Sequence, residues 1–234
     1  MAEKTPLWET YPKLVQWVRE DHLRVKAFGG GHDFLHALMV AQYGKLIAED
    51  ERVGTLAWIA GICHNADRLF PDLEDREIAE FVGFQIDRGT DVSSDEKRII
   101  VEAVLRHSEL NKLEDNPVTV ALKDADRLVN IGPGVVIRSG QLFHDLPAFD
   151  PRFITEQDPR ATYRKPMTSF RDLQHHMEWE EMLRLPRARE IARPWFEASR
   201  AFLAGFERQL REVGLLPYPF GEEFEAAYQQ SKRG

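Results

Sequence analysis

The segment from residue 53 to residue 65 constrains the fold of this chain more than any other. It is apolar on almost every side of a helical projection, and such a helix is normally enclosed by other elements. The segment ends in His64-Asn65, with Asp67 just beyond. A helix of the buried type thus leads directly into an imidazole, an amide and a carboxyl group. Its apolar residues are Leu56, Ala57, Trp58, Ile59, Ala60, Ile62 and Cys63.

Most of the remaining chain also has helical spacing, and no segment alternates convincingly between apolar and polar residues as a strand does. One apolar stripe lies within 14–23, and an amphipathic segment spans 74–88. A second stripe, entered through three glycines, predicts another helix with an apolar face. Because the recognisable elements are all helical, we predict an all-α fold. The second stripe consists of Phe34, Leu35, Leu38, Met39, Gln42 and Leu46.

Helix boundaries in the second half can be read from capping and proline signals. The sequence Ser93-Ser94-Asp95-Glu96 resembles a capping box, which predicts a helix from there to about Ser108. Pro117 suits the first turn of the next helix. Gly132-Pro133-Gly134 can end that helix or kink it. Helical spacing then returns between residues 169 and 213.

Prolines also mark the less regular parts of the chain. Four of them punctuate residues 145–167, which predicts a long loop excursion of the kind that often has a function. Within the later helical segment, we expect Pro186 to break the helix and Pro194 to kink it. The tail 214–234 can add a short helix after Pro219.

Composition limits the range of functions. The 234 residues, 43% hydrophobic and 30% charged, suit one large globular domain or a domain with a small appendage. A net charge of −8 does not indicate a nucleic-acid-binding surface. The first residues lack the apolar core of a signal peptide, and no apolar run reaches the ~18 residues of a membrane span. The single cysteine, Cys63, fits a reducing compartment, so we expect a cytoplasmic protein without a membrane partner. A homodimer is compatible with the apolar residues of the later helices.

Three short segments carry residues that can bind a metal. His32 and His36 are four residues apart, so on a helix both project from one face. His64 and Asp67, three residues apart, do the same, whereas two aspartates at 124 and 126 face different ways. A set of imidazoles and a carboxylate suits manganese, iron, cobalt or zinc, and suits magnesium less well. For any single residue of this set, an ordinary polar role on a helix is the alternative.

The ordered motifs resemble the HD-domain metal-dependent phosphohydrolases, and in particular a bacterial group of small uncharacterised HD hydrolases. The first motif of that group is His-Asp-x-x-His-x-x-Arg-Val, and the second is His-Asp-x-x-Asp. The third is Asp-Ala-Asp-Arg-Leu followed by Ile-Gly. A helix that ends in His-Ser is a further feature of the group, and the resemblance extends over about residues 20–213. The matching segments are His32-Asp33-Phe-Leu-His36-Ala-Leu-Met39-Val40, His64-Asn65-Ala-Asp67, Asp124-Ala-Asp126-Arg127-Leu128-Val-Asn-Ile131-Gly132 and Arg106-His107-Ser108.

The resemblance implies an HD-domain helical bundle with additional C-terminal helices. It also implies that His36, His64 and Asp126 bind a divalent metal, and the fourth ligand position falls on Asn65. Asp67 falls where the family often has an acid that helps to activate water.

Four other side chains lie in segments that match the family and are weaker candidates for contact with a phosphate: His32, His107, Lys123 and Arg127. Three of them have a specific structural alternative. For Lys123 it is a solvated helix face, and for Arg127 a surface salt bridge. His107 can instead interact with the dipole of a helix C-terminus. Asp33 is expected to cap a helix, and Asp124 to lie behind the site or on the surface.

The chain departs from the family pattern at two positions. Asn65 offers an amide oxygen without a negative charge, which weakens the binding of a divalent cation. Met39 replaces an arginine, and a methionine at this place is expected in the core. The favoured function is therefore metal-dependent hydrolysis of a phosphate ester, with a nucleotide as one candidate and with reduced activity. The alternative is a degenerate HD domain that binds a phosphorylated ligand or a partner without catalysis. Under the first hypothesis, Asn65→Asp should tighten metal binding.

Overall fold

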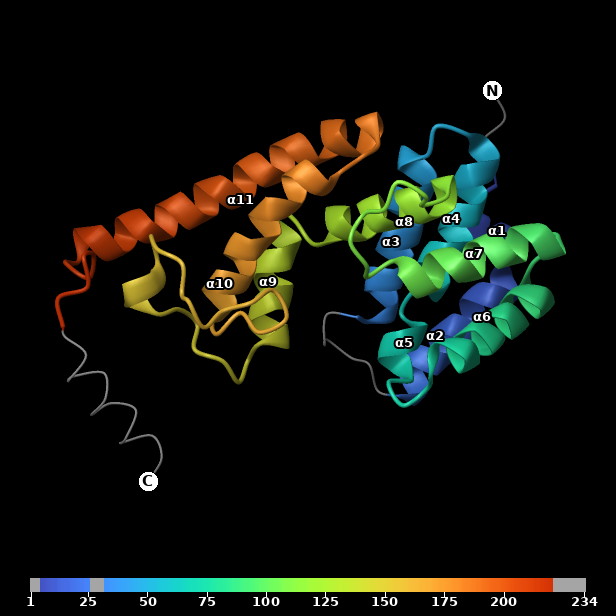
Figure 1. Cartoon of the computed structure of the whole chain (residues 1–234), viewed down its shortest axis with the longest axis horizontal. Coiled ribbons are helices and arrows are strands. Elements are labelled where there is room, and N and C mark those ends of the chain that lie inside the picture. The colour runs from blue at the N-terminus through green and yellow to red at the C-terminus, as the bar shows by residue number, and fades with distance from the viewer. Residues whose placement is uncertain (1–4, 26–31, 221–234) are drawn as a thin grey trace.

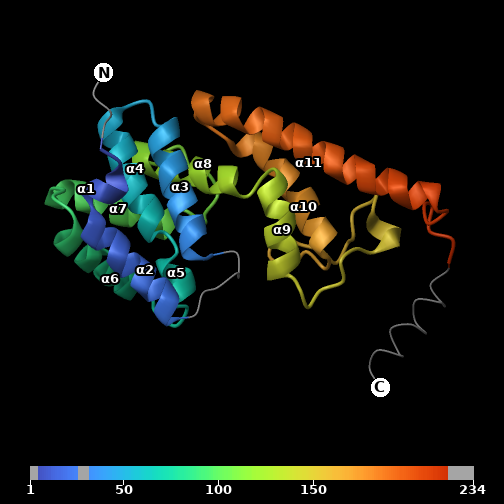
Figure 2. The same cartoon turned by 180° about the vertical axis from the view of Figure 1, so that it is seen from behind.

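The computed structural model describes residues 5–25 and 32–220 (Figures 1 and 2). These residues form helices joined by loops, and within them the only β pairing is an isolated bridge between Thr162 and Lys165. The predicted all-α class is confirmed. The helices are α1 Leu7–Thr10, α2 Pro12–Arg24, α3 Phe34–Ile47, α4 Glu51–Cys63, α5 Ala66–Leu69, α6 Asp75–Gly89, α7 Ser94–Arg106, α8 Pro117–Val129, α9 Pro133–Leu142, α10 Ser169–His176 and α11 Pro186–Glu212, with short 3₁₀ helices η1 Pro151–Phe153 and η2 Met177–Met182.

Local capping residues explain where several of these helices begin. The predicted capping box opens α7, because the Ser93 hydroxyl accepts from the Glu96 N–H and Glu96 accepts from the Ser93 N–H. Asp33 caps α3 as expected, with its carboxylate 2.8 Å from the His36 backbone nitrogen. Pro117 occupies the first turn of α8. The α7 helix ends at Arg106, slightly before the predicted boundary.

The central pair of helices, α3 and α4, lies close together because small residues form the contact. A Cβ on Gly61 of α4 would lie only 2.6 Å from the Cα of Ala41 on α3. A Cβ on Gly44 of α3 would likewise lie 3.1 Å from the carbonyl oxygen of Ala57 on α4. The third helix of this core, α8, packs against both. The predicted burial of the segment at 53–65 is thus confirmed, since α4 is enclosed on nearly all sides.

The buried face of α3 differs from the predicted one. Leu35, Met39 and Leu46 are exposed, so the expectation that Met39 lies in the core is wrong. The buried residues of α3 are His36, Ala37, Val40, Ala41, Gly44 and Ile47. The physical reason is that α3 is apolar around most of its circumference. Close contact with α4 selects the side with small residues and leaves the large ones outside.

The C-terminal helices form a second part of the molecule, beside the bundle of α1 to α8 (Figure 1). Both views show the long helix α11 extending from the bundle across α9 and α10 (Figure 2). Its first half contributes Phe196 to the main core, whereas Leu210 near its end belongs to a separate small cluster with Ile154 and Phe170. Pro186 begins α11, and Pro194 lies within it without ending it.

The predicted excursion at 145–167 contains only the short helix η1 and the bridge between Thr162 and Lys165. The helix suggested after Pro219 falls in 221–234, which lies outside the described residues. Across the described part of the chain, no helix combines the length and the apolar character needed to cross a membrane.

Candidate metal centre

Three side chains from three helices converge on one point. His36 lies in the first turn of α3, His64 ends α4, and Asp126 lies in α8. Each offers one ligand atom, and these atoms all lie within 4.8 Å of one another. The three residues are those that the resemblance implies as metal ligands, and the packing of α3, α4 and α8 brings them together.

The distances within this cluster are those of groups facing a common centre. The Nε2 atoms of His36 and His64 are 3.2 Å apart. The Oδ1 atom of Asp126 lies 3.3 Å from Nε2 of His36 and 4.0 Å from Nε2 of His64. Both imidazoles are 1% exposed, whereas the Asp126 side chain is 24% exposed. Among these three side chains, Asp126 is the one that solvent reaches.

The tautomer of His64 follows from its hydrogen bond. Its Nδ1 lies 2.7 Å from the carbonyl oxygen of Gly61, which requires a proton on Nδ1 and leaves a lone pair on Nε2. Burial, then the nearby imidazole of His36, holds the pKa of His64 well below its ordinary value. A metal binds to the lone pair of a neutral imidazole. The Nε2 lone pair of His64 faces His36 and Asp126, so His64 is in the form that can bind a metal.

The carboxyl group of Asp126 is ionised where the imidazole of His64 is neutral. Burial alone would raise its pKa, but the hydrogen bond with His36 lowers the pKa of this carboxyl well below its ordinary range. The cluster thus presents two imidazole nitrogens and a carboxylate oxygen. This donor set fits a borderline divalent cation.

Two further histidines extend the cluster into a row of four rings. The centroid of His32 is 5.3 Å from that of His36, and the centroid of His107 is 5.2 Å from that of His64. His107 ends α7, and its Nδ1 lies 2.6 Å from the Val104 carbonyl oxygen. His32 precedes α3, so it approaches His36 from outside the helix and not from one helical face as predicted. Burial lowers the pKa of His32 to about 4.

Asn65 is held by its amide nitrogen. Nδ2 lies 3.1 Å from the His32 carbonyl oxygen, 3.3 Å from that of Asp33 and 3.2 Å from Nε2 of His22. Because two carbonyls can only accept, the nitrogen must be on this side. The opposite atom, Oδ1, is buried and has no hydrogen-bond partner among the described residues. Asn65 therefore connects α2, the start of α3 and the end of α4, and its role as a ligand stays a prediction.

Asp67 lies in the short helix α5 directly after the cluster. One carboxylate oxygen is 3.6 Å from Nε of Arg68, and the other is buried without a hydrogen-bond partner in the described residues. The side chain is 38% exposed, so solvent reaches it. Its proposed part in proton transfer remains a prediction.

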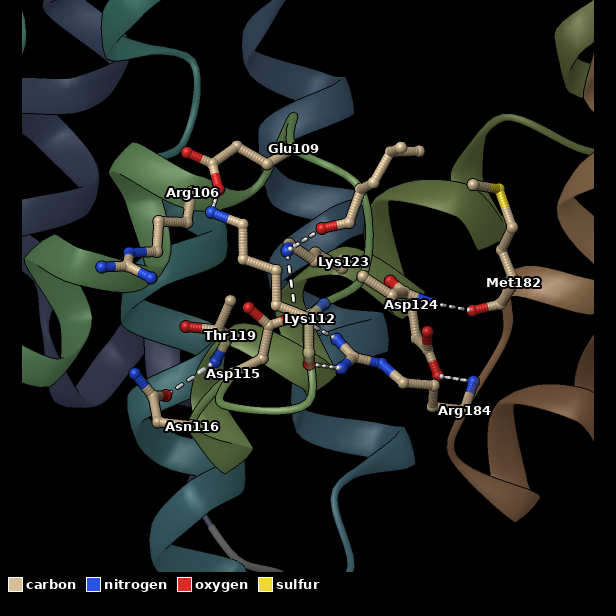
Figure 3. A network of polar contacts seen from close by, with 12 residues as sticks. Arg106, Glu109, Lys112, Asp115, Asn116, Thr119, Lys123, Asp124, Met182 and Arg184 are labelled. Atoms are coloured by element: carbon tan, nitrogen blue, oxygen red, sulfur yellow. Dashed lines mark hydrogen bonds and ion pairs between the residues drawn. The ribbon is translucent and has the colours of Figure 1, made fainter.

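Lys123 has a different role from the predicted one. Its ammonium group is fully buried, 2.9 Å from Oδ2 of Asp115 and 3.0 Å from the Leu110 carbonyl oxygen (Figure 3). Arg184 binds the same carboxylate at 2.8 Å. A side chain without exposed surface does not touch a substrate. Lys123 was predicted to contact a substrate or to lie on a solvated helix face. The structure shows instead that it forms an internal ion pair with Asp115.

Asp124 belongs to the same network (Figure 3), and Arg127 contacts Asp124. Asp124 is fully buried and accepts hydrogen bonds from the backbone nitrogens of Arg184 and Leu185, both at 2.8 Å. Arg127 lies 3.4 Å from Asp124 and 3.3 Å from the carbonyl oxygen of Met182. These contacts join α8 to the start of α11. Arg127 thus forms a buried salt bridge, not the surface one considered above, and a substrate contact for it stays a prediction.

Sequence patterns did not reveal three residues around the cluster. His22 contacts Asn65 as described above, Asn130 contacts Asp126, and Arg138 contacts Asn130. His22 had no motif around it, and Arg138 belongs to another helix. Asn130 is four residues after Asp126, a spacing at which two side chains on a helix meet, and this signal could have identified it.

Comparisons with known proteins agree with this architecture. A scan of protein-family models and a search of curated proteins find no match to this chain. Among solved structures, an HD-superfamily hydrolase from Bacillus thuringiensis matches with a TM-score of 0.60 at 14% identity, covering 87% of this chain and 97% of the other. A Lactobacillus plantarum protein matches with a TM-score of 0.59 at 17% identity over 91% and 100%. Bacillus subtilis YpgQ, solved in complex with ADP, matches with a TM-score of 0.57 at 18% identity over 85% and 98%.

Such identities establish the fold and nothing further. The chain has the HD-domain fold, and its buried His-His-Asp cluster lies where three helices of that fold converge.

Proposed function

We propose that this protein is a divalent-metal-dependent phosphohydrolase that acts on a phosphate ester. The observation that supports the proposal most is the 3.2 Å separation of the His36 and His64 Nε2 atoms beside the Asp126 carboxylate. Two buried imidazole nitrogens this close can share either a proton or a cation, and the lone pair of His64 is already directed there. A divalent cation satisfies all three groups at once.

His36, His64 and Asp126 would hold this cation, and Asn65 is the candidate for a fourth ligand. When bound, the cation supplies Lewis-acid chemistry, because it lowers the pKa of a water and polarises a phosphoryl oxygen. Backbone carbonyls at the Nδ1 atoms fix the ring orientations of His64 and His107. Asp67 is proposed to accept the proton of the attacking water at Oδ1, which is buried and has no hydrogen-bond partner within the described ranges.

Positive charge for binding a phosphate is available nearby. Arg68 is half exposed beside Asp67, and its charge contributes to lowering the pKa of His32. Arg138 also contributes to that shift, so both guanidinium groups lie within electrostatic range of the histidine row. His32 is neutral at pH 7, so we propose that it contributes a hydrogen bond to the substrate and no charge.

A nucleotide is the substrate class that we favour. Three aromatic rings from the C-terminal part contact one another, with centroids 5.6 Å apart for Tyr163 and Trp179 and 4.4 Å apart for His176 and Trp179. Tyr163 is more than half exposed, so a base can stack on it. The neighbour YpgQ was solved with ADP.

The alternative is a degenerate domain that binds a phosphorylated ligand without turnover. The amide at position 65 favours it, because a carboxylate there would add a negative charge beside the cation. Metal content separates the two proposals. Protein purified without chelator should contain about one equivalent of a divalent metal by elemental analysis. The proposal of an enzyme would be refuted if the purified protein held no divalent metal and added manganese neither bound to it nor stabilised it.

Two substitutions test the assignment of ligands. His64→Ala should abolish both manganese binding and hydrolysis across a panel of nucleotides and phosphomonoesters, and unchanged activity would rule out this site. Asn65→Asp tests the fourth position. The sequence alone predicts tighter metal binding, but the structure adds a cost, because a carboxylate oxygen would face the carbonyls of His32 and Asp33. We expect the free energy of unfolding to fall by about 1–3 kcal/mol. No gain in manganese affinity would exclude residue 65 from the ligands.

A further inference from the structure

Asn130 contacts the carboxylate of the proposed ligand Asp126. It follows the last turn of α8, and its Nδ2 lies 2.9 Å from the backbone oxygen of Asp126 and 3.2 Å from Oδ1 of the same residue. That Oδ1 is also the atom 3.3 Å from Nε2 of His36. The amide therefore holds the oxygen that faces the histidines.

Arg138 determines which way this amide points. Its NH1 atom lies 3.2 Å from Oδ1 of Asn130 and 3.4 Å from the carbonyl oxygen of Val129. A guanidinium group only donates hydrogen bonds, so the oxygen of Asn130 must face Arg138 and the nitrogen must face Asp126. Because Arg138 is on α9, a chain of hydrogen bonds runs from the C-terminal helices to Asp126.

The position of α9 is itself fixed at the turn that follows Asn130. Gly132 has a φ of 75°, which a residue with a side chain rarely adopts. Its backbone N–H donates to the hydroxyl of Ser199 on α11 at 3.0 Å. The turn between α8 and α9 is thus anchored to α11, which holds Arg138 close to Asn130.

We propose that Asn130 is a positioning residue for Asp126, and that Arg138 acts through Asn130, so that the docking of α9 tunes the metal affinity of the centre. This inference rests on the metal site of the proposed function. Asp126 needs such support because it is the most exposed member of the cluster, and the amide of Asn130 restricts the rotation of its carboxylate toward solvent. Partners that orient a ligating carboxylate typically change metal affinity by about 10- to 100-fold.

The test uses full-length protein freed of metal with a chelator and titrated with manganese by isothermal calorimetry. Asn130→Ala should weaken manganese binding by about 10- to 100-fold. Arg138→Met, which keeps a long side chain, should weaken it in the same direction but less. In the double variant Arg138→Met should weaken manganese binding less than it does when Asn130 is present, because the part of its effect that passes through the amide is lost. Additive effects, or a dissociation constant for Asn130→Ala within twofold of the wild type, would overturn the proposal.

Asn116→Ala is a matched control at the other end of the same helix. Asn116 caps α8 through a hydrogen bond of 2.9 Å from the Thr119 nitrogen and does not contact the cluster. Its loss should lower the melting temperature by about 2–4 °C and leave the manganese dissociation constant unchanged. If Asn116→Ala weakened manganese binding as much as Asn130→Ala, the effect of Asn130→Ala would be explained by general destabilisation, and the proposal would be overturned. If the wild type itself binds no manganese, the proposed function fails; if it binds and Asn130→Ala binds equally, only this inference fails.

Discussion

The contact between α3 and α4 makes Gly61 the most informative position for a single added methyl group. These two helices carry His36 and His64, so their separation sets the distance between the two imidazoles. In Gly61→Ala the new Cβ would lie 2.6 Å from the Cα of Ala41 and 2.7 Å from its nitrogen. Both atoms are backbone, so no side-chain rotation relieves the overlap and the helices must separate.

The expected cost can be worked out from these distances. The new Cβ falls about 0.8 Å short of the 3.4 Å at which ordinary contact begins. Overpacking of a core costs about 1–3 kcal/mol, and a clash with backbone belongs at the upper end of that range. Alanine in place of a helical glycine returns about 1 kcal/mol. We expect a net loss of about 2 kcal/mol in the free energy of unfolding, or a melting temperature lowered by about 4–8 °C.

Thermal unfolding and manganese titration should both be measured on Gly61→Ala. Because the shift of the helices also moves the Gly61 carbonyl that orients His64, manganese binding should weaken along with stability. Gly83→Ala is the matched control, since the nearest atom to its Cβ would be Cδ of Lys97 at 4.0 Å. The control should gain about 0.5–1 kcal/mol. A Gly61→Ala protein as stable as the control, with unchanged manganese affinity, would refute the reasoning.

Three further predictions follow from other buried or paired groups. Lys123→Met leaves Asp115 buried with a reduced set of cationic partners, so urea unfolding should show a loss of about 3 kcal/mol, and a loss below about 1 kcal/mol would contradict an internal ion pair. The hydrogen bond from Arg52 lowers the pKa of Glu96 to about 2, so the stability that this carboxylate contributes is complete above its ordinary pKa of 4.5 and disappears as the pH falls toward 2. In Glu96→Gln the melting temperature should depend less on pH over that interval. The same pH dependence in the variant and the wild type would disprove this. Burial raises the pKa of the Cys63 thiol to about 12, so a maleimide at neutral pH should label the protein only after unfolding; rapid labelling of the folded protein would contradict that burial.

The helices and the candidate ligand residues could be predicted from local patterns. The capping box at Ser93, the proline at the start of α8 and the apolar segment that became α4 each depend on neighbours within one or two turns. The order of the histidine and aspartate motifs was likewise readable, because a family resemblance depends on residue types and spacing. These features are properties of short stretches of chain.

The errors concern features that depend on distant parts of the chain. Met39 was expected in the core, but α3 is apolar on several sides, and only its contact with the small residues of α4 decides which side is buried. Lys123 was expected on the surface or at a substrate, but Asp115 and Arg184 reach it from segments that no helical periodicity relates to α8. The contact of His22 with Asn65 joins residues far apart in sequence.

The sequence by itself determined the all-α class, most helix boundaries and the identity of His36, His64 and Asp126 as candidate ligands. Hydrogen bonding along a helix and capping at its ends are local, so spacing and residue type are sufficient to reveal them. Only the tertiary structure decided that these three residues meet, that Asn65 is held by two carbonyls and a histidine, and that Asn130 connects Asp126 to α9. Those contacts arise from the packing of whole helices, which is set by the sum of many distant side-chain contacts.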